Sequence, residues 1–159
     1  MGITSGRSDV LENVVAEDLE RCYKRLGGVV DALAGSTVLV TGAAGFLGSY
    51  LVDFLAGLGR LGQVAPRAVI ALDNYSTGKR DTLAHLRGRS DVSLLEADIG
   101  DAISLTQDID FIVHAASIAS PVIYRRYPVE TIRANVTGTW NILELARRTN
   151  TRSVMYLST

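Results

Sequence analysis

Three glycines, Gly42, Gly45 and Gly48, lie between a short apolar run and a helical pattern of residues. The apolar run Thr37–Val40 is typical of a strand, and Phe46–Leu58 is typical of a helix. Glycines let the backbone turn sharply and approach an anion, and the first N–H groups of the helix face that anion with the positive end of the helix dipole. The spacing therefore predicts a pyrophosphate cradle built from Gly42, Gly45, Phe46, Leu47 and Gly48.

Asp73 follows the second predicted strand, Ala68–Leu72. A carboxylate at this position can accept both hydroxyls of an adenosine ribose and repels a 2′-phosphate, which favours NAD over NADP. An acid at a strand end is as often simply solvated, so the interpretation depends on the glycine turn that precedes it. We interpret the segment between Gly57 and Pro66 as an enlarged surface loop.

Two further segments follow predicted strands. Asp98 and Ile99 come after Val92–Leu95, where a carboxylate or backbone group can meet the adenine amine, although Asp98 by itself is more typical of a turn. After Phe111–Val113 the chain continues with the small residues Ala115, Ala116 and Ser117, which let the rest of a dinucleotide lie against the backbone. His114 has no second ligand at a useful spacing, so we expect no metal site.

Strand and helix patterns alternate from Ser36 to the end, which predicts an α/β fold of the Rossmann type with a doubly wound parallel sheet. The fifth strand is expected at Ser153–Leu157. The remaining helical segments are expected at Lys79–Leu86 and Pro128–Thr149, with a short turn near Ala102–Leu105. Residues 1–35 form a helical extension, which we interpret as an extra amphipathic layer, with a dimerisation arm as the alternative.

Composition excludes several classes of protein. A net charge of −1 provides no basic surface for nucleic acid, and a single cysteine, Cys22, excludes an internal disulfide and a cysteine-built zinc site. No apolar stretch is long enough to cross a membrane, and the first residues do not have the pattern of a signal peptide. We therefore expect a cytoplasmic protein that binds neither membranes nor nucleic acid.

From Ser36 to the last residue the chain resembles the extended short-chain dehydrogenase/reductase family of nucleotide-sugar-modifying enzymes. Five motifs in order carry the resemblance: Thr41-Gly42-x-x-Gly45-Phe46-Leu47-Gly48, Leu72-Asp73-Asn74, Ala97-Asp98-Ile99, His114-Ala115-Ala116 and Asn135-Val136-x-Gly138-Thr139. The stretches Asp73–Lys79 and Ser117–Pro121 look most like UDP-glucuronate decarboxylases. The 4,6-dehydratases of dTDP-glucose and the nucleotide-sugar 4-epimerases share most of these residues and remain alternatives.

The resemblance implies a bound NAD, a nucleotide-sugar substrate and a homodimer of the full-length protein. It adds Asn74, Ser76, Thr77, Gly78 and Asn135 to the candidate NAD-binding residues, and it implies that Thr159 orients the C4 hydroxyl of the sugar while NAD accepts and returns a hydride. Arg133 is a candidate for holding an acidic substrate, with an exposed helix arginine as the alternative.

The family's catalytic Tyr-x-x-x-Lys should follow Thr159, so we expect residues 36–159 to be a cofactor-binding domain truncated before that motif and before the sugar-binding part. The pattern Tyr75-x-x-x-Lys79 lies after the second strand, at the adenosine end, and is rejected as catalytic. The alternative of another class is a non-catalytic dinucleotide-binding fragment.

Overall fold

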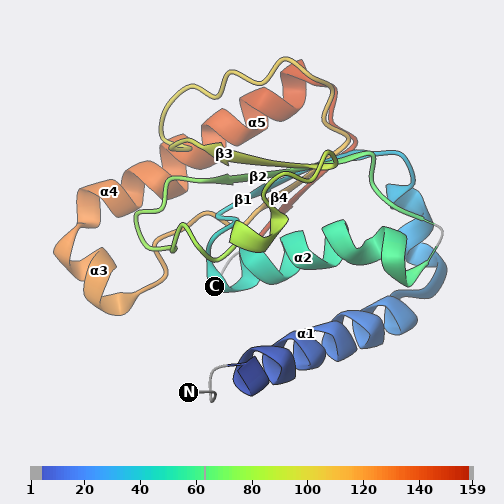
Figure 1. The fold of residues 1–159 in the computed structure, drawn as a ribbon. Helices are drawn as coiled ribbons and strands as arrows, with labels where there is room; N and C mark the ends of the chain where they lie inside the picture. The colour runs from blue at the N-terminus through green and yellow to red at the C-terminus, as the bar shows by residue number, and fades with distance from the viewer. Residues whose placement is uncertain (1–4, 63, 158–159) are drawn as a thin grey trace.

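A single sheet of five parallel strands forms the centre of the computed structural model, which describes residues 5–62 and 64–157, with side chains from residue 14 onward (Figure 1). The strand order is β3-β2-β1-β4-β5, and all four neighbouring pairs are parallel. The strands are β1 (Thr37–Thr41), β2 (Ala68–Asp73), β3 (Val92–Glu96), β4 (Phe111–His114) and β5 (Ser153–Tyr156). The α/β fold predicted from the sequence is confirmed.

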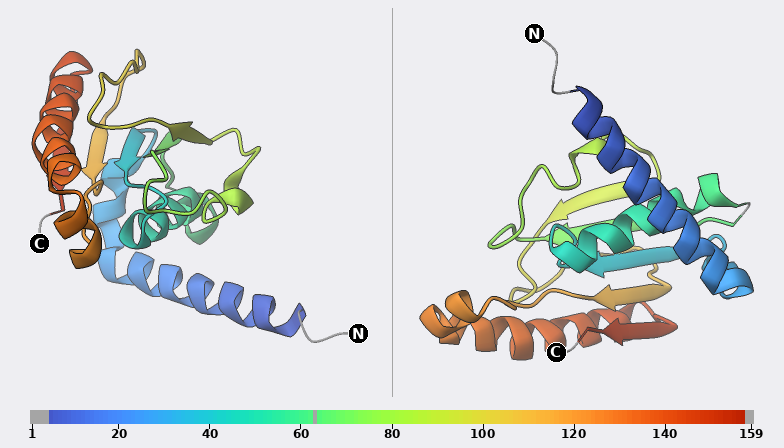
Figure 2. Two further views of the ribbon diagram at one scale, coloured as in Figure 1. Left: turned by 90° about the vertical axis from the view of Figure 1, so that its left-hand side faces the viewer. Right: turned by 90° about the horizontal axis from the view of Figure 1, so that it is seen from below.

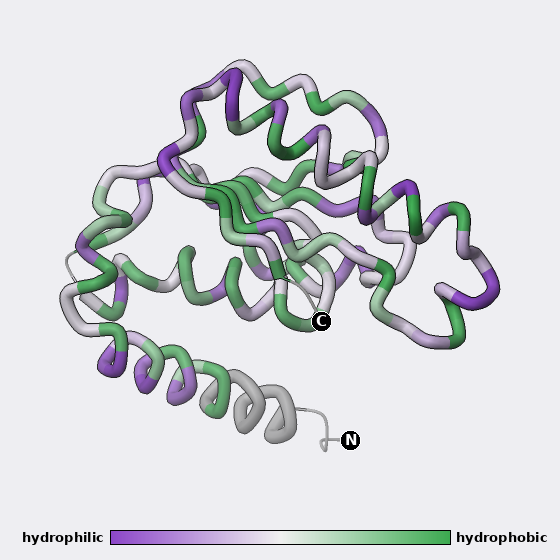
Figure 3. Tube along the Cα trace, turned by 180° about the vertical axis from the view of Figure 1, so that it is seen from behind, coloured by the Kyte–Doolittle hydropathy of each residue, from purple (hydrophilic) through white to green (hydrophobic). Residues whose placement is uncertain are grey.

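The two faces of the sheet bury alternate residues of the same strands. Val38 and Val40 of β1 belong to one hydrophobic cluster, while Leu39 between them belongs to the other. Successive side chains of a strand point to opposite faces, so a strand that is covered on both sides reads as a continuous apolar run. The central strands are accordingly coloured mostly as hydrophobic in Figure 3.

Helices cover both faces of the sheet (Figure 2). Helix α2 (Phe46–Leu61) contributes Val52, Leu55 and Leu58 to the first cluster. Helix α5 (Thr139–Arg148) contributes Ile142 and Leu145 to the second cluster, on the opposite face. Because the strands are parallel, their carboxyl ends all lie at one edge of the sheet. The turns that follow the strands therefore lie along that edge.

The predicted surface loop between Gly57 and Pro66 is wrong in its first half. Helix α2 continues to Leu61, and both Gly57 and Leu58 are buried. Leu58 is fully buried in the first cluster, and the helix continues for a further turn to Leu61 despite the low helix propensity of Gly57 and Gly59. The connection that remains between α2 and β2 is short.

Two other predicted helices differ from those observed. The expected helix Lys79–Leu86 is reduced to a short 3-10 turn, η2 (Ala84–Leu86), because Leu83 and Leu86 alone are buried against the core. The expected helix Pro128–Thr149 is divided into α4 (Pro128–Ile132), the π-helical segment η3 (Arg133–Gly138) and α5. The short helix α3 (Pro121–Arg126) was not predicted, and the turn expected near Ala102–Leu105 is irregular.

The N-terminal helix α1 (Ser5–Leu26) lies across the outer face of α2 (Figure 2). Leu19 contacts α2 at Gly57, where an added Cβ would lie 3.8 Å from Leu19 Cδ1. Tyr23 packs against the first cluster, and its hydroxyl lies so close to Gly62 that a Cβ there would come within 2.1 Å. The following 3-10 segment η1 (Gly27–Leu33) buries Val30 in the same cluster. The segment therefore forms an additional layer on the sheet domain.

Strand β5 is an edge strand that pairs only with β4. Unlike β1 and β2 it is not buried on both faces, since Met155 is 57% and Tyr156 is 45% exposed. Within the described residues, no helix is both long enough and apolar enough to cross a membrane.

Candidate functional site

The glycine turn lies where the order of the strands reverses, between β1 and β4. Gly42 has a φ of +67°, and a Cβ there would lie 2.8 Å from the backbone of Ala115. Only glycine combines this left-handed conformation with so close an approach. The turn after β1 and the turn after β4 are thereby pressed together. In sheets of this kind ligands bind outside the carboxyl ends of the strands at such a point.

The other two glycines of the turn have different surroundings. A Cβ on Gly48 would lie 2.0 Å from the carbonyl oxygen of Gly42, so Gly48 is needed for the first turn of α2 to pack against the loop. A Cβ on Gly45 would meet that oxygen at 3.1 Å, and Gly45 otherwise borders open space in the cleft. Gly45 is also the N-cap of α2, so the free backbone N–H groups of the helix begin beside it.

Asp73 ends β2 and is almost fully buried. Its Oδ2 accepts the N–H of Ala44 at 2.8 Å, and its Oδ1 accepts the N–H of Tyr75 at 2.7 Å. These two bonds fix the carboxylate plane against the glycine turn. An ionised carboxylate has about four acceptor positions, so the two that remain are available to a ligand in the cleft.

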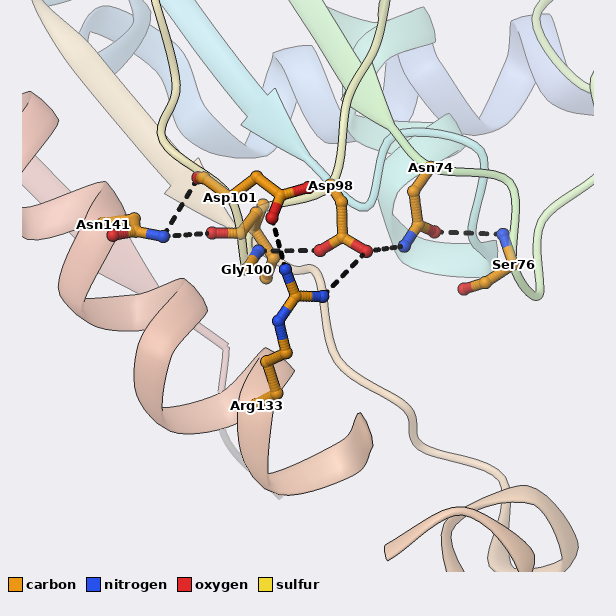
Figure 4. A network of polar contacts seen from close by, with 8 residues as sticks. Asn74, Ser76, Asp98, Gly100, Asp101, Arg133 and Asn141 are labelled. Carbon is orange, nitrogen blue, oxygen red and sulfur yellow. Dashed lines mark hydrogen bonds and ion pairs between the residues drawn. The ribbon is translucent and has the colours of Figure 1, made fainter. Parts of the chain in front are cut away.

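Asp98 lies in the turn after β3 and is held from two sides (Figure 4). Its Oδ1 accepts the N–H of Gly100 at 2.7 Å, and its Oδ2 accepts a bond from Asn74 Nδ2 at 3.1 Å. Asn74 is itself fixed, because its Oδ1 accepts the N–H of Ser76 at 3.0 Å. The loops after β2 and β3 are thus connected through side chains that border the same cleft.

The π-helical segment η3 brings a third wall to the cleft. Asn135 accepts a hydrogen bond from Ser117 Oγ at 2.9 Å, which connects η3 to the turn after β4. Arg133, at the start of the same segment, forms ion pairs with Asp98 and Asp101 in the turn after β3. Segments of π-helix often occur at functional sites, because the extra residue re-aims the side chains beyond it.

His114 ends β4 and is buried beneath the site. Its Nδ1 is 2.6 Å from Thr41 Oγ1, and its Nε2 is 3.2 Å from Thr139 Oγ1. Burial lowers the pKa of His114 from 6.5 to about 4. The imidazole is therefore neutral near pH 7 and connects β1, β4 and α5. Within the part of the chain that the structure describes, no group of three His, Cys, Asp or Glu side chains could hold a metal ion.

These segments enclose a cleft of about 220 Å³. It is lined by ten of the predicted cofactor-binding residues, namely Gly42, Gly45, Asp73, Asn74, Ser76, Thr77, Asp98, Ile99, Ala116 and Ser117. Four others lie behind the lining or beside it: Gly48, Gly78, Ala115 and Asn135. Leu47 is 57% exposed and does not line the cleft. Phe46 is 80% exposed and does not line the cleft. Thr159 lies outside the described residues.

Sequence reasoning missed part of the lining. Ile118, Glu130 and Ala134 border the cleft. Arg133 lies at the end of the cleft formed by Asn74 and Asp98. The sequence names Arg133 as a candidate for holding an acidic substrate; in the structure it lines the cleft and pairs with Asp98 and Asp101. The signal available for Glu130 was its spacing of three residues from Arg133, which places both on one face of a helix. The packing of α4 and η3 against the sheet domain decides which face of these helical segments borders the cleft, and the spacing alone does not give it.

The groups that line the cleft fit the chemistry of a dinucleotide. The glycine turn leaves room beside the free backbone N–H groups of α2 for a pyrophosphate, and Asp73, at the end of the neighbouring strand β2, presents carboxylate acceptors to the same cleft. A model of the NAD dependent epimerase/dehydratase family matches residues 38–159. The chain therefore belongs to this family.

Curated relatives are decarboxylases of a nucleotide sugar. UDP-glucuronic acid decarboxylase 1 of Arabidopsis thaliana is 42% identical over 118 residues, which cover 74% of this chain and 25% of the plant protein. UDP-glucuronic acid decarboxylase 1 of Xenopus tropicalis is 35% identical over 154 residues, which cover 91% of this chain and 34% of the frog protein. The chain thus spans about a quarter to a third of the length of these relatives. Since residues 36–159 are only 124 of the 159 residues, the match with the frog protein extends into the N-terminal segment.

Among solved structures, a double mutant of DesIV, a dTDP-glucose 4,6-dehydratase from Streptomyces venezuelae crystallised with NAD, superposes with a TM-score of 0.68. It is 32% identical in sequence, and the match covers 77% of this chain and 39% of DesIV. The resemblance to nucleotide-sugar enzymes read from the sequence is confirmed.

Proposed function

We propose that this chain is the NAD-binding part of a nucleotide-sugar-modifying enzyme, and that the whole enzyme is a UDP-glucuronic acid decarboxylase. The observation that carries the proposal is the cleft at the strand reversal, which is lined by the glycine turn and by the carboxylate of Asp73, held against that turn by the N–H of Ala44. The curated relatives at 35–42% identity support the choice of substrate.

Each part of the cleft has a role in this proposal. The turn of Gly42 and Gly45 receives the pyrophosphate, while Asp73 accepts the ribose hydroxyls and repels a 2′-phosphate. The carboxylate of Asp98 accepts a bond from the adenine amine. Small side chains at Ala116 and Ser117 let the nicotinamide half lie along the backbone. When bound, NAD supplies a reversible hydride acceptor.

The reaction is explained by the chemistry of the proposed substrate. Oxidation of UDP-glucuronate at C4 makes the C6 carboxylate that of a β-keto acid, which loses CO₂ readily. Thr159 is proposed to donate or accept a hydrogen bond at the C4 oxygen and so orient it. The general base is not assigned among residues 1–159, because the pattern Tyr75-x-x-x-Lys79 lies beside Asp73 at the adenosine end.

A second candidate is a dTDP-glucose 4,6-dehydratase or a 4-epimerase, which the likeness to DesIV favours. These reactions share the first oxidation at C4 and differ in the fate of the oxidised sugar. A dehydratase releases water, an epimerase releases nothing, and a decarboxylase releases CO₂. A non-catalytic dinucleotide-binding role is the candidate of another class, and it predicts NAD binding without turnover in the full-length protein.

We also propose that the full-length protein is a homodimer. A stripe of large apolar side chains runs along α4, η3 and α5 on the side away from the sheet, and its members are 52–72% exposed: Val129, Ile132, Val136, Trp140 and Leu143. Apolar patches of this kind commonly mark interfaces between proteins. Association of two such stripes would bury them.

The first test measures cofactor preference by calorimetric titration of the protein with NAD and with NADP. NAD should bind clearly more tightly, because the Asp73 carboxylate repels a 2′-phosphate. Asp73→Ala should weaken NAD binding by about 1–3 kcal/mol, the range for losing hydrogen bonds to a charged group. Asp73→Asn, which keeps an acceptor for one backbone N–H, should relax the preference. Equal affinity of the parent protein for both dinucleotides would contradict the assignment.

The second test identifies the reaction. Full-length protein is incubated with NAD and with UDP-glucuronate, dTDP-glucose or UDP-galactose in separate reactions. The products are analysed by mass and, for UDP-galactose, whose epimer has the same mass, by chromatography. Loss of the mass of CO₂ from UDP-glucuronate alone is expected. Loss of water from dTDP-glucose instead would replace the decarboxylase proposal with the dehydratase.

A further inference from the structure

Arg133 provides the one positive charge among the described residues that line the cleft. The other charged lining residues are the carboxylates Asp73, Asp98 and Glu130. A dinucleotide adds the negative charge of its pyrophosphate to this site. The position of the Arg133 guanidinium among these negative groups should therefore affect how a dinucleotide binds in the cleft.

The guanidinium is placed by the turn after β3 (Figure 4). Its Nη2 forms a hydrogen-bonded ion pair with Asp101, and its Nη1 lies 3.6 Å from Asp98 Oδ2. The group lies against the backbone of Gly100, where a Cβ would come within 2.7 Å of Arg133 Cζ. The position of the Arg133 guanidinium thus depends on Asp98 and Asp101 and on the absence of a side chain at Gly100.

The carboxylate of Asp98 is in turn held by three segments of the chain. The N–H of Gly100 comes from the β3 turn, Asn74 Nδ2 from the β2 loop, and the guanidinium of Arg133 from η3. Without Arg133, the Asp98 carboxylate would keep two hydrogen bonds but would lose the positively charged group beside it. A carboxylate held by opposed donors has a fixed direction for its free acceptor positions.

We propose that Arg133 is a positioning residue that fixes the Asp98 carboxylate for the 6-amino group of adenine, and that it thereby sets the base selectivity of the site. The inference rests on the proposed NAD-binding function. A fixed carboxylate accepts a hydrogen bond from a 6-amino purine but repels the oxygen of a 6-oxo purine. A carboxylate that is held by fewer donors is fixed less firmly and discriminates less between the two.

The test compares the dissociation constants of NAD and of nicotinamide hypoxanthine dinucleotide, measured by calorimetry. The two ligands differ in the purine base, with an oxygen in place of the 6-amino group, so the ratio of their affinities isolates the contact at the base. Arg133→Met should lower the preference for NAD by about two- to fivefold, the effect expected for a half-exposed ion pair. Arg133→Lys, which keeps the charge, should restore most of it. Arg147→Met is the matched control, because Arg147 pairs with Glu144 on α5 away from the cleft.

A second variant displaces Arg133 without changing any charge. Gly100→Ala places a methyl group where the guanidinium lies and should lower the preference for NAD to a similar degree. Gly59→Ala on α2, where an added Cβ makes only an ordinary contact at 3.5 Å, is its control and should leave the preference unchanged. Thermal unfolding of each variant verifies that it folds.

The outcomes separate this inference from the proposed function. If the parent protein binds NAD but Arg133→Met and Gly100→Ala keep its preference, Arg133 does not position Asp98. If Arg133→Met raises the preference for NAD, the guanidinium contacts the base directly and the inference is also wrong. If the parent protein binds neither dinucleotide, the proposed NAD-binding function itself fails.

Discussion

The three glycines of the turn have separate roles, although the sequence motif presents them as one unit. Gly42 adopts a left-handed conformation against Ala115, and Gly48 lets the first turn of α2 approach the carbonyl of Gly42. Gly45 has an extended backbone, with φ of −75° and ψ of 173°, which any residue can adopt. Gly42 and Gly48 are therefore required by the fold, whereas Gly45 is proposed to be required by the ligand.

This division predicts opposite results for two substitutions. Gly45→Val should abolish NAD binding with little loss of stability, because its side chain fills the place proposed for the pyrophosphate. Gly48→Ala should destabilise the fold by about 1–3 kcal/mol, the usual cost of overpacking, since its Cβ would overlap a backbone oxygen. Urea unfolding and NAD titration of both variants measure the two effects. Undiminished NAD binding by folded Gly45→Val would show that the pyrophosphate lies elsewhere.

Three elements meet at the buried imidazole of His114. It contacts Thr41 at the end of β1 and Thr139 at the start of α5, and its ring lies 5.3 Å from that of Tyr156 on β5. Thr41 Oγ1 also accepts the N–H of Ala116 at 3.3 Å. The positions of the glycine turn and of the turn after β4 therefore depend on a neutral, hydrogen-bonded histidine.

The stability of the domain should consequently depend on pH through His114. Burial lowers its pKa from 6.5 to about 4, so the unfolded chain takes up a proton at a pH where the folded chain does not. The free energy of unfolding should be unaffected above pH 6.5 and should fall by on the order of 3 kcal/mol as the pH is lowered towards 4.

Urea unfolding between pH 7 and pH 4.5 checks this prediction, with His114→Gln as the comparison. The variant should be less stable at pH 7 and should show a shallower loss of stability on acidification. Parallel pH dependences in the two proteins would mean that other groups cause the loss.

At the scale of the whole molecule, the described residues, which we propose are the NAD-binding part of the enzyme, have an exposed apolar stripe on α4, η3 and α5 and an exposed edge strand β5. Residues 1–159 expressed alone should bind NAD but should show no turnover on nucleotide sugars. The reason is that their Tyr75-x-x-x-Lys79 pattern lies at the adenosine end, and general-base catalysis contributes about 10²–10⁴-fold to a rate. Product analysis by mass measures turnover, with the full-length protein as the positive control. Decarboxylation of UDP-glucuronate by residues 1–159 at the rate of the full-length protein would overturn this prediction.

The sequence by itself determined the sheet, the place of the cleft and most of its lining. The central strands are continuous apolar runs, and the glycine spacing and the acids after β2 and β3 are local signals that do not depend on distant contacts. Only the tertiary structure decided how far α2 extends, since the helix continues past the predicted end at Leu58 to Leu61, where Tyr23 of α1 packs against Gly62. It likewise decided the break at η3, where a Cβ on Gly138 would lie 2.5 Å from Ile99, and the partners of Arg133. These features arise from packing between segments far apart in the chain, which periodicity and propensity do not report.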